Sequence, residues 1–130
     1  MMDMYQENIL DHAQHPRNWG LLEACHFHAS DENPLCGDML EVTLRVDEND
    51  IIVAVGWEGQ GCAISQAAAS MLGEEVIGKP LEIVKDYDKE AILELLGIPI
   101  SMSRIKCALL SLKVIKAAAY NLENAASDHD

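Results

Sequence analysis

The sequence predicts an α+β domain in which a small three-stranded antiparallel sheet carries helices packed on one face. Two observations lead to this class. Apolar and polar residues alternate in short segments of the first half of the chain, as they do in half-buried strands. After residue 62 the apolar residues recur at the spacing of helices. A run of strands followed by a run of helices indicates an α+β arrangement.

The length is that of one domain. The chain has 130 residues, so we expect a single domain, residues 1–130, whose core is large enough to be stable without disulfides. Neither an internal repeat nor a low-complexity segment suggests a second domain. The polar tail after about residue 124 is expected to be disordered.

The first element is a helix predicted over residues 2–14. Tyr5, Ile9 and Ala13 recur at helical spacing. The helix ends before Pro16 because proline disfavours helical backbone in the residue that precedes it. His12 is expected on the exposed surface of this helix.

The first strand is predicted over residues 25–29. Cys25 lies on the same face as the apolar residues of this strand, so we expect it to be a small core residue rather than a ligand. His26 and His28 lie on the opposite face, which is expected to face solvent.

The second and third strands are predicted to form a hairpin. Residues 39–46 alternate apolar side chains with polar or charged ones, residues 48–50 supply the turn, and residues 51–57 are β-branched and apolar. Trp57, at the end of the third strand, is expected to pack in the core.

Helices are predicted for the second half of the chain. One lies between residues 62 and 78, with Cys62 at its entrance. Pro80 opens a short helix that ends at Lys85, and a further helix covers residues 89–96. The long C-terminal helix is predicted to have Ser103 as its N-cap.

The charge limits the classes of partner. A formal net charge of -13 repels phosphate backbones and anionic lipid surfaces, so neither nucleic acid nor a membrane is an expected partner. No secretory signal pattern and no membrane-length apolar stretch occurs in the sequence. We therefore expect a cytoplasmic protein with reduced thiols.

The cysteines carry the main functional signal. Of the 4 cysteines, Cys36, Cys62 and Cys107 lie in loop or helix-start contexts, which favours chemistry over core filling. Glycine-rich turns surround Cys36 and Cys62, and a helix N-terminus lies beside Cys62. Cys107 is expected near the start of the last helix, away from its buried stripe of apolar residues.

Neighbouring residues are predicted to support the thiolates. Gly37 and Gly61 let the backbone turn and present N–H groups to the cysteines. Arg104 and Lys106 precede Cys107 near a helix start, where the helix dipole slightly disfavours cations. Their presence there favours a functional role.

Asp38 is the expected oxygen ligand. It follows Cys36 with one glycine between them, so its carboxylate can reach the same point as the thiolate. Three sulfurs and one oxygen suit tetrahedral zinc or the iron of an iron-sulfur cluster, and they suit calcium or magnesium poorly. The residues alone leave two interpretations open, namely ligands that converge on one metal site and unrelated buried or surface thiols.

Taken together, the cysteine contexts resemble the NifU-like family of iron-sulfur cluster assembly scaffolds, of the IscU and SufU type. The resemblance spans most of the chain and rests on segments 5–18, 33–38, 61–71 and 104–110. It implies an α+β fold.

The resemblance also implies a function and a ligand set. Cys36, Asp38, Cys62 and Cys107 would hold a transient cluster, expected to be of the 2Fe-2S type, or zinc as an alternative occupant. A cysteine desulfurase would deliver sulfur as a persulfide, with Cys107 and Cys36 as the candidate acceptors, and iron-sulfur acceptor or carrier proteins would receive the cluster. The protein would be a scaffold and carrier rather than a turnover enzyme.

The chain departs from each branch of the family at one point. IscU proteins have histidine before the third cysteine, in a proline-containing motif that a chaperone reads. Here Lys106 stands at that place, which argues against chaperone recognition of the usual kind. Lysine there resembles SufU, but the stretch from Cys62 to Cys107 is too short for the SufU insertion. The alternative function is a SufU-type zinc-binding sulfur relay that uses the same ligands.

Two further hypotheses do not need a metal. One is a thiol enzyme with a cysteine nucleophile and His12 or His28 as its base. The other is a small interaction domain with incidental thiols.

Overall fold

The computed structural model describes residues 4–33, 37–97 and 100–120. Its helices and strands follow the predicted order, strands first and helices afterwards, behind one N-terminal helix. They are α1 (Met4–Gln14), β1 (Phe27–Asn33), β2 (Asp38–Val46), β3 (Ile52–Gln60), α2 (Ala63–Val76), α3 (Leu81–Lys85), α4 (Lys89–Leu96) and α5 (Met102–Ala119).

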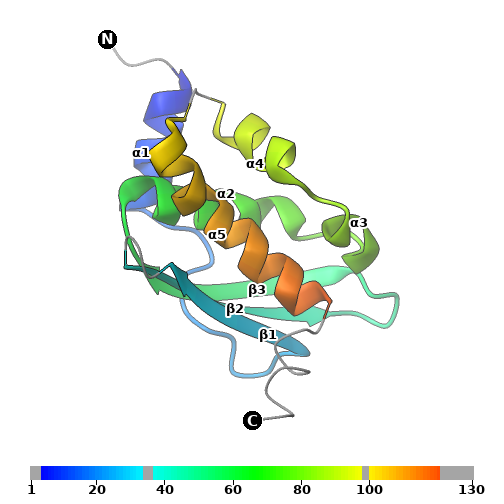
Figure 1. The fold of residues 1–130 in the computed structure, drawn as a ribbon. Coiled ribbons are helices and arrows are strands. Elements are labelled where there is room, and N and C mark those ends of the chain that lie inside the picture. Colours follow the sequence, from blue (N-terminus) through cyan, green and yellow to red (C-terminus); the bar gives the residue numbers. More distant parts are fainter. Residues whose placement is uncertain (1–3, 34–36, 98–99, 121–130) are drawn as a thin grey trace.

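The sheet has the order β1-β2-β3, and both pairs of neighbouring strands are antiparallel. The helices gather on one side of it, and the segment that joins α1 to β1 runs along the other side (Figure 1). This arrangement confirms the predicted α+β class and the predicted hairpin. None of the helices in the described ranges combines the length and apolar character needed to cross a membrane.

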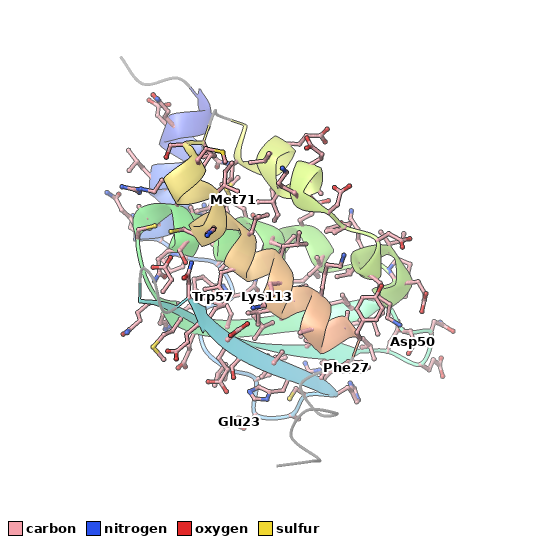
Figure 2. All side chains as sticks on the ribbon, viewed as in Figure 1. Glu23, Phe27, Asp50, Trp57, Met71 and Lys113 are labelled. Atoms are coloured by element: carbon pink, nitrogen blue, oxygen red, sulfur yellow. The ribbon has the colours of Figure 1, made fainter. Side chains whose placement is uncertain are left out.

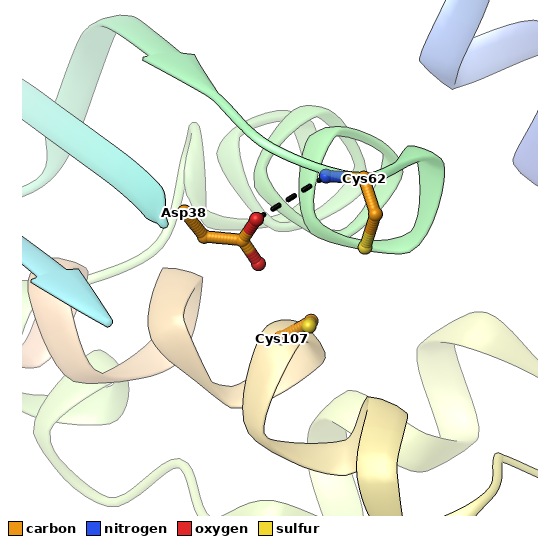
Figure 3. A group of neighbouring side chains, drawn as sticks. All are labelled: Asp38, Cys62 and Cys107. Carbon is orange, nitrogen blue, oxygen red and sulfur yellow. Dashed lines mark hydrogen bonds between the residues drawn. The ribbon is translucent and has the colours of Figure 1, made fainter. Parts of the chain in front are cut away.

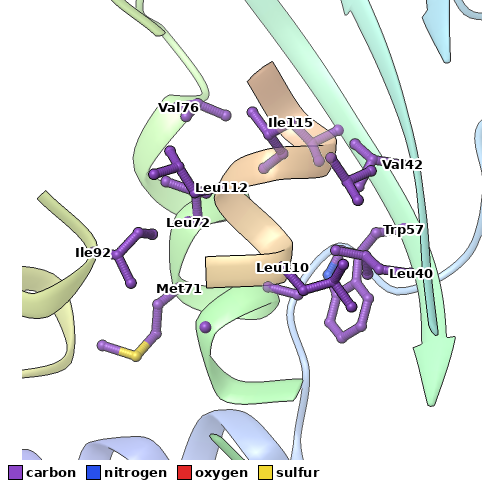
Figure 4. Close-up of a cluster of buried hydrophobic side chains, with 14 of the residues drawn as sticks. Leu40, Val42, Trp57, Met71, Leu72, Val76, Ile92, Leu110, Leu112 and Ile115 are labelled. Carbon is purple, nitrogen blue, oxygen red and sulfur yellow. The ribbon is translucent and has the colours of Figure 1, made fainter. Parts of the chain in front are cut away.

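The core lies between the sheet and the helices (Figure 4). Leu44 and Trp57 from the sheet, Leu72 from α2 and Ile115 from α5 are all essentially inaccessible to water. Burying a side chain of this size stabilises the folded state by about 1.5–3 kcal/mol. The burial of Trp57 confirms its predicted packing role, and its indole N–H donates to the backbone oxygen of Arg17 at 2.8 Å.

The first strand lies later in the chain than predicted. β1 begins at Phe27, which pairs with Leu44, and it continues through polar residues to Asn33. Cys25 precedes the strand and is exposed, so the prediction that it fills the core was wrong. Polar residues can occupy this strand because it lies at the edge of the sheet, where one face and one backbone edge remain open to solvent.

His12 is buried instead of exposed, which corrects the prediction for α1. Its Nδ1 lies 2.7 Å from the hydroxyl of Ser70 on α2, and the same hydroxyl accepts a hydrogen bond from the N–H of Arg17 at 2.9 Å. This polar contact fixes α1 and the residues after it on α2. The helical spacing of the sequence contains no sign of it, because the partner of His12 lies on another helix.

The buried imidazole predicts that acid destabilises the fold. Burial, followed by the charge of Arg17, holds the pKa of His12 below its usual 6.5. Below about pH 6.5 the unfolded chain therefore binds a proton that the folded protein refuses, so the free energy of unfolding falls as the pH drops further. Urea unfolding of the wild type at pH 7.5 and at pH 5.5 measures this loss.

Two variants assign the effect to the right histidine. His12→Gln is expected to lower stability at pH 7.5 by about 1–3 kcal/mol and to reduce the additional loss at pH 5.5. His15→Gln removes an exposed histidine and should keep the wild-type pH dependence. Equal pH dependence in His12→Gln and the wild type would contradict the assignment.

Candidate metal centre

Three of the predicted ligands meet at one point, although each comes from a different element. Asp38 begins β2, Cys62 is the N-cap residue of α2, and Cys107 lies near the start of α5. One ligand atom from each residue lies within 4.8 Å of the others (Figure 3). Asp38 and Cys107 are buried, and Cys62 is partly exposed.

The fourth predicted ligand, Cys36, lies outside the described residues. Its part in the site therefore stays a prediction. The structure describes the next residue, Gly37, which has φ +77° and donates its N–H to the backbone oxygen of Asn33 at 2.8 Å. This left-handed conformation favours glycine and leads the chain into Asp38 at the start of β2.

The carboxylate of Asp38 is only half satisfied. Its Oδ1 accepts a hydrogen bond from the N–H of Cys62 at 3.3 Å, where its negative charge also meets the N-terminus of α2 favourably. Its Oδ2 is buried and has no hydrogen-bond partner within the described residues. An unsatisfied buried carboxylate oxygen is costly, and a cation bound beside the two sulfurs would satisfy it. The residues therefore fit a metal.

Gly61 makes the approach of Asp38 possible. A Cβ atom at residue 61 would lie 2.3 Å from Oδ1 and 2.7 Å from Cγ of Asp38, closer than atoms can approach. The hydroxyl of Ser65, in the first turn of α2, would lie 3.1 Å from the same Cβ. Ser65 was not among the predicted site residues. Its spacing of three from Cys62 at a helix start was the available signal.

Cys107 is 5% exposed, which corrects the prediction that it lies away from the buried stripe of its helix. The physical reason is that α5 contacts β1 and β2 as well as α2, α3 and α4, so its buried arc is wider than a single stripe. The helix begins at Met102 with Ser101 as its N-cap residue, so the predicted Ser103 cap was also wrong.

The two cations near Cys107 lie at the protein surface. Arg104 and Lys106 are exposed at the start of α5. Lys106 lines a separate hollow of about 270 Å³ together with Glu32 and Lys113. Their predicted support of a thiolate has no geometric counterpart in these contacts.

The donor set limits the chemistry. Two sulfur atoms and one carboxylate oxygen, buried in part, suit zinc or iron better than calcium or magnesium. Among the described residues, no histidine nitrogen joins this cluster. His12 contacts Ser70, and His28 contacts Glu41 at 2.5 Å. This arrangement gives no support to the hypothesis of a cysteine nucleophile activated by either histidine.

The sequence resembles known proteins over most of its length. The zinc-dependent sulfurtransferase SufU of Bacillus subtilis (strain 168) is 35% identical over 130 residues, covering 87% of this chain and 87% of that protein. The iron-sulfur cluster assembly scaffold protein IscU of Aquifex aeolicus (strain VF5) is 37% identical over 115 residues, covering 88% and 73%. The chain is thus similar to members of both branches.

A solved structure and a family model agree with this. The crystal structure of a putative iron-sulfur cluster assembly scaffold protein for the SUF system from Fervidobacterium islandicum AW-1 matches with a TM-score of 0.71 and 28% identity, covering 87% of this chain and 94% of that one. The family model described as the NifU-like N terminal domain matches residues 4–128. The chain therefore belongs to the family of NifU-like N-terminal domains.

Proposed function

We propose that this protein is an iron-sulfur cluster assembly scaffold. It accepts sulfur from a cysteine desulfurase together with iron, holds a transient 2Fe-2S cluster as its cargo, and transfers the cluster to acceptor proteins. Two observations carry the proposal: a carboxylate oxygen of Asp38 lies within 4.8 Å of the Cys62 and Cys107 sulfurs, and its buried Oδ2 has no hydrogen-bond partner among the described residues. Membership of the family supports it.

The ligands divide the work by their chemistry. Thiolates from Cys62 and Cys107 are soft donors that bind iron strongly, and Cys36 completes the set from the segment between β1 and β2. The carboxylate of Asp38 is a harder donor with a less covalent bond, so it makes one corner of the site labile. A scaffold needs one labile ligand, because it must release the cluster to an acceptor.

Sulfur arrives by exchange at a thiolate. The thiolate of Cys107 or Cys36 attacks the terminal sulfur of the persulfide on the desulfurase, a new S–S bond forms, and the cysteine of the desulfurase leaves as a thiolate. The protein is then a carrier of sulfur and of the finished cluster, and any sulfurtransferase-like role is a persulfide relay. Arg104 and Lys106, which are exposed and precede Cys107 in α5, supply positive charge that attracts an anionic sulfur donor.

A second candidate function is a zinc-binding sulfur relay. It is favoured by the tetrahedral preference of zinc for such thiolate and carboxylate donors and by the similarity to a zinc-dependent sulfurtransferase over 87% of both chains. In this function zinc occupies the same four ligands, and one cysteine leaves the metal to collect sulfur. The two functions differ in what the purified protein holds and in whether a cluster forms.

Metal analysis and absorption spectroscopy distinguish the two functions. After anaerobic incubation with ferrous iron, cysteine and a cysteine desulfurase, we expect the wild type to gain the visible absorption of a cluster. Cys62→Ser combined with Cys107→Ser should lower that absorption by about tenfold or more, because two soft ligands are lost. Cys25→Ser, which alters an exposed cysteine outside the cluster of ligand atoms, is the matched control. Stoichiometric zinc with no visible absorption would contradict the scaffold function and favour the zinc-binding sulfur relay.

The carboxylate is expected to set the lifetime of the cargo. Asp38→Ala should slow transfer of the cluster to an apo-ferredoxin and lengthen the decay time of the visible absorption, because the labile oxygen ligand is missing. Stopped-flow transfer and absorption decay measure the two effects on the same sample. Faster loss of the cluster from this variant would show that Asp38 retains the cargo instead of releasing it.

Gly61 is expected to control the metal affinity through the position of Asp38. Gly61→Ala forces the carboxylate away, so zinc affinity should fall by about tenfold or more in competition with a chromophoric chelator. Gly73→Ala is the matched control, because its Cβ would meet its nearest neighbour, Val55, at an ordinary 3.5 Å and alanine favours the helix. Equal zinc affinity for Gly61→Ala and the control would argue against this role.

A further inference from the structure

The side of the sheet that faces away from the helices is covered over only part of its area. A Cβ atom at Gly56 would lie 2.3 Å from the backbone oxygen of Gly20, and the N–H of Leu22 donates to the hydroxyl of Thr43 at 3.0 Å. The segment between α1 and β1 therefore packs against the cross-strand row that contains Thr43 and Gly56. Glu23, in that segment, lies on the side away from the helices (Figure 2).

The next two rows of the same face form a hollow of about 500 Å³, which we call the outer-face hollow. The strand register places its side chains in two cross-strand rows. These rows are Ser30, Glu41 and Glu58, and Glu32, Met39 and Gln60. The row between them points its side chains to the other face, and Asp31 from that row pairs with Lys113 on α5 at 2.6 Å.

The charge pattern of the outer-face hollow is unfavourable for the isolated protein. Glu41 and Glu58 are directly opposite each other on neighbouring strands, a placement in which like charges destabilise a sheet. The imidazole Nε2 of His28 contacts the carboxylate of Glu41. No lysine or arginine is among the residues that line the hollow. A positively charged occupant would remove the repulsion.

The occupant must also cover an apolar side chain. Met39 lines the outer-face hollow and is 44% exposed. The amide of Gln60 donates to its sulfur at 3.3 Å. A flexible thioether of this kind adapts to an apolar side chain of a partner. The hollow thus offers one apolar contact surrounded by carboxylates.

The spacing of the carboxylates favours a protein over a metal ion. Within the described ranges, the Asp38, Cys62 and Cys107 group is the one set of potential ligands whose atoms lie within 4.8 Å of one another. In that part of the chain the glutamates of the outer-face hollow form no such group, so the structure gives no support to a metal ion there. They match separate cationic side chains along another chain, and a second copy of this protein, with a net charge of -13, is a poor candidate.

We propose that the outer-face hollow is a docking surface for a basic protein segment, in which lysine or arginine side chains pair with Glu32, Glu41 and Glu58 while an apolar side chain covers Met39. The inference does not depend on the metal or on the cargo. The outer-face hollow lies close to the candidate metal centre, because Asp38 and Met39 are adjacent in β2 and point to opposite faces of the sheet. A partner docked on the hollow therefore lies close to the edge of the sheet where the candidate metal centre is built.

The test uses a short cationic peptide of alternating lysine and leucine, and an anionic counterpart in which glutamate replaces lysine. We expect the cationic peptide to shift the amide NMR signals of residues 30–32, 39–41 and 58–60 in the full chain, and the anionic one to leave them unchanged. Binding should weaken as salt is added. Shifts spread evenly over the acidic helices α2 and α4 would overturn the proposal.

Matched charge variants give the affinity test. Glu32→Gln combined with Glu58→Gln should weaken binding of the cationic peptide roughly fivefold, and Met39→Ala should weaken it as well. Glu90→Gln combined with Glu94→Gln removes the same charge from the exposed surface of α4 and should bind like the wild type. Equal affinities for the two double variants would overturn the proposal.

A stability measurement checks that the loss of binding is not a loss of fold. Glu58→Gln relieves the repulsion from Glu41, so its unfolding midpoint should be equal to that of the wild type or higher by about 1 °C. Lower stability together with weaker binding would contradict the proposal. Sedimentation of the free chain tests whether a second copy of this protein occupies the hollow. Self-association that Glu32→Gln combined with Glu58→Gln abolishes would make a second copy the occupant and overturn the proposal.

Discussion

The half-satisfied carboxylate of Asp38 is the constraint on which this end of the molecule depends. One oxygen accepts the N–H of Cys62 at the start of α2, while the other is buried without a partner in the described part of the chain. Burying a charge in this way costs free energy, so the surrounding packing has to hold it in place. Gly61 permits the close approach, and the contacts of α5 with both the sheet and α2 bring Cys107 to the same point.

Much of the fold could be predicted because its signals are local. Alternation along β2, the β-branched apolar run of β3 and helical spacing along α2 all depend on neighbouring residues, and these predictions were correct. His12 was predicted wrongly because its partner, Ser70, is 58 positions away on another helix. Cys25 was predicted wrongly because the pairing of β1 with β2 begins at Phe27. The residues alone left open whether Asp38, Cys62 and Cys107 converge, since their spacing in the sequence carries no distance information, and the resemblance favoured convergence.

The two faces of the sheet have different relations to stability. On the helix side, apolar side chains such as Leu44 are fully removed from water, and each adds to the stability of the fold. On the other side, the segment through Leu22 covers one row and leaves the neighbouring rows with facing glutamates. Because β2 alternates its side chains between the two faces, Asp38 and Met39 connect the candidate metal centre and the outer-face hollow through one strand.

The same ligand set accounts for both capture and release. The unfolded chain holds no preformed site, so part of the free energy of metal binding appears as stabilisation of the folded protein. A site made of thiolates alone would hold its cargo so tightly that transfer would be slow. In the proposed ligand set a carboxylate takes the place of one sulfur, and Oδ1 of that carboxylate accepts a hydrogen bond from the N–H of Cys62. In the proposed function, Asp38 keeps this hydrogen bond when the cargo leaves. This contact keeps the carboxylate in position between one cargo and the next.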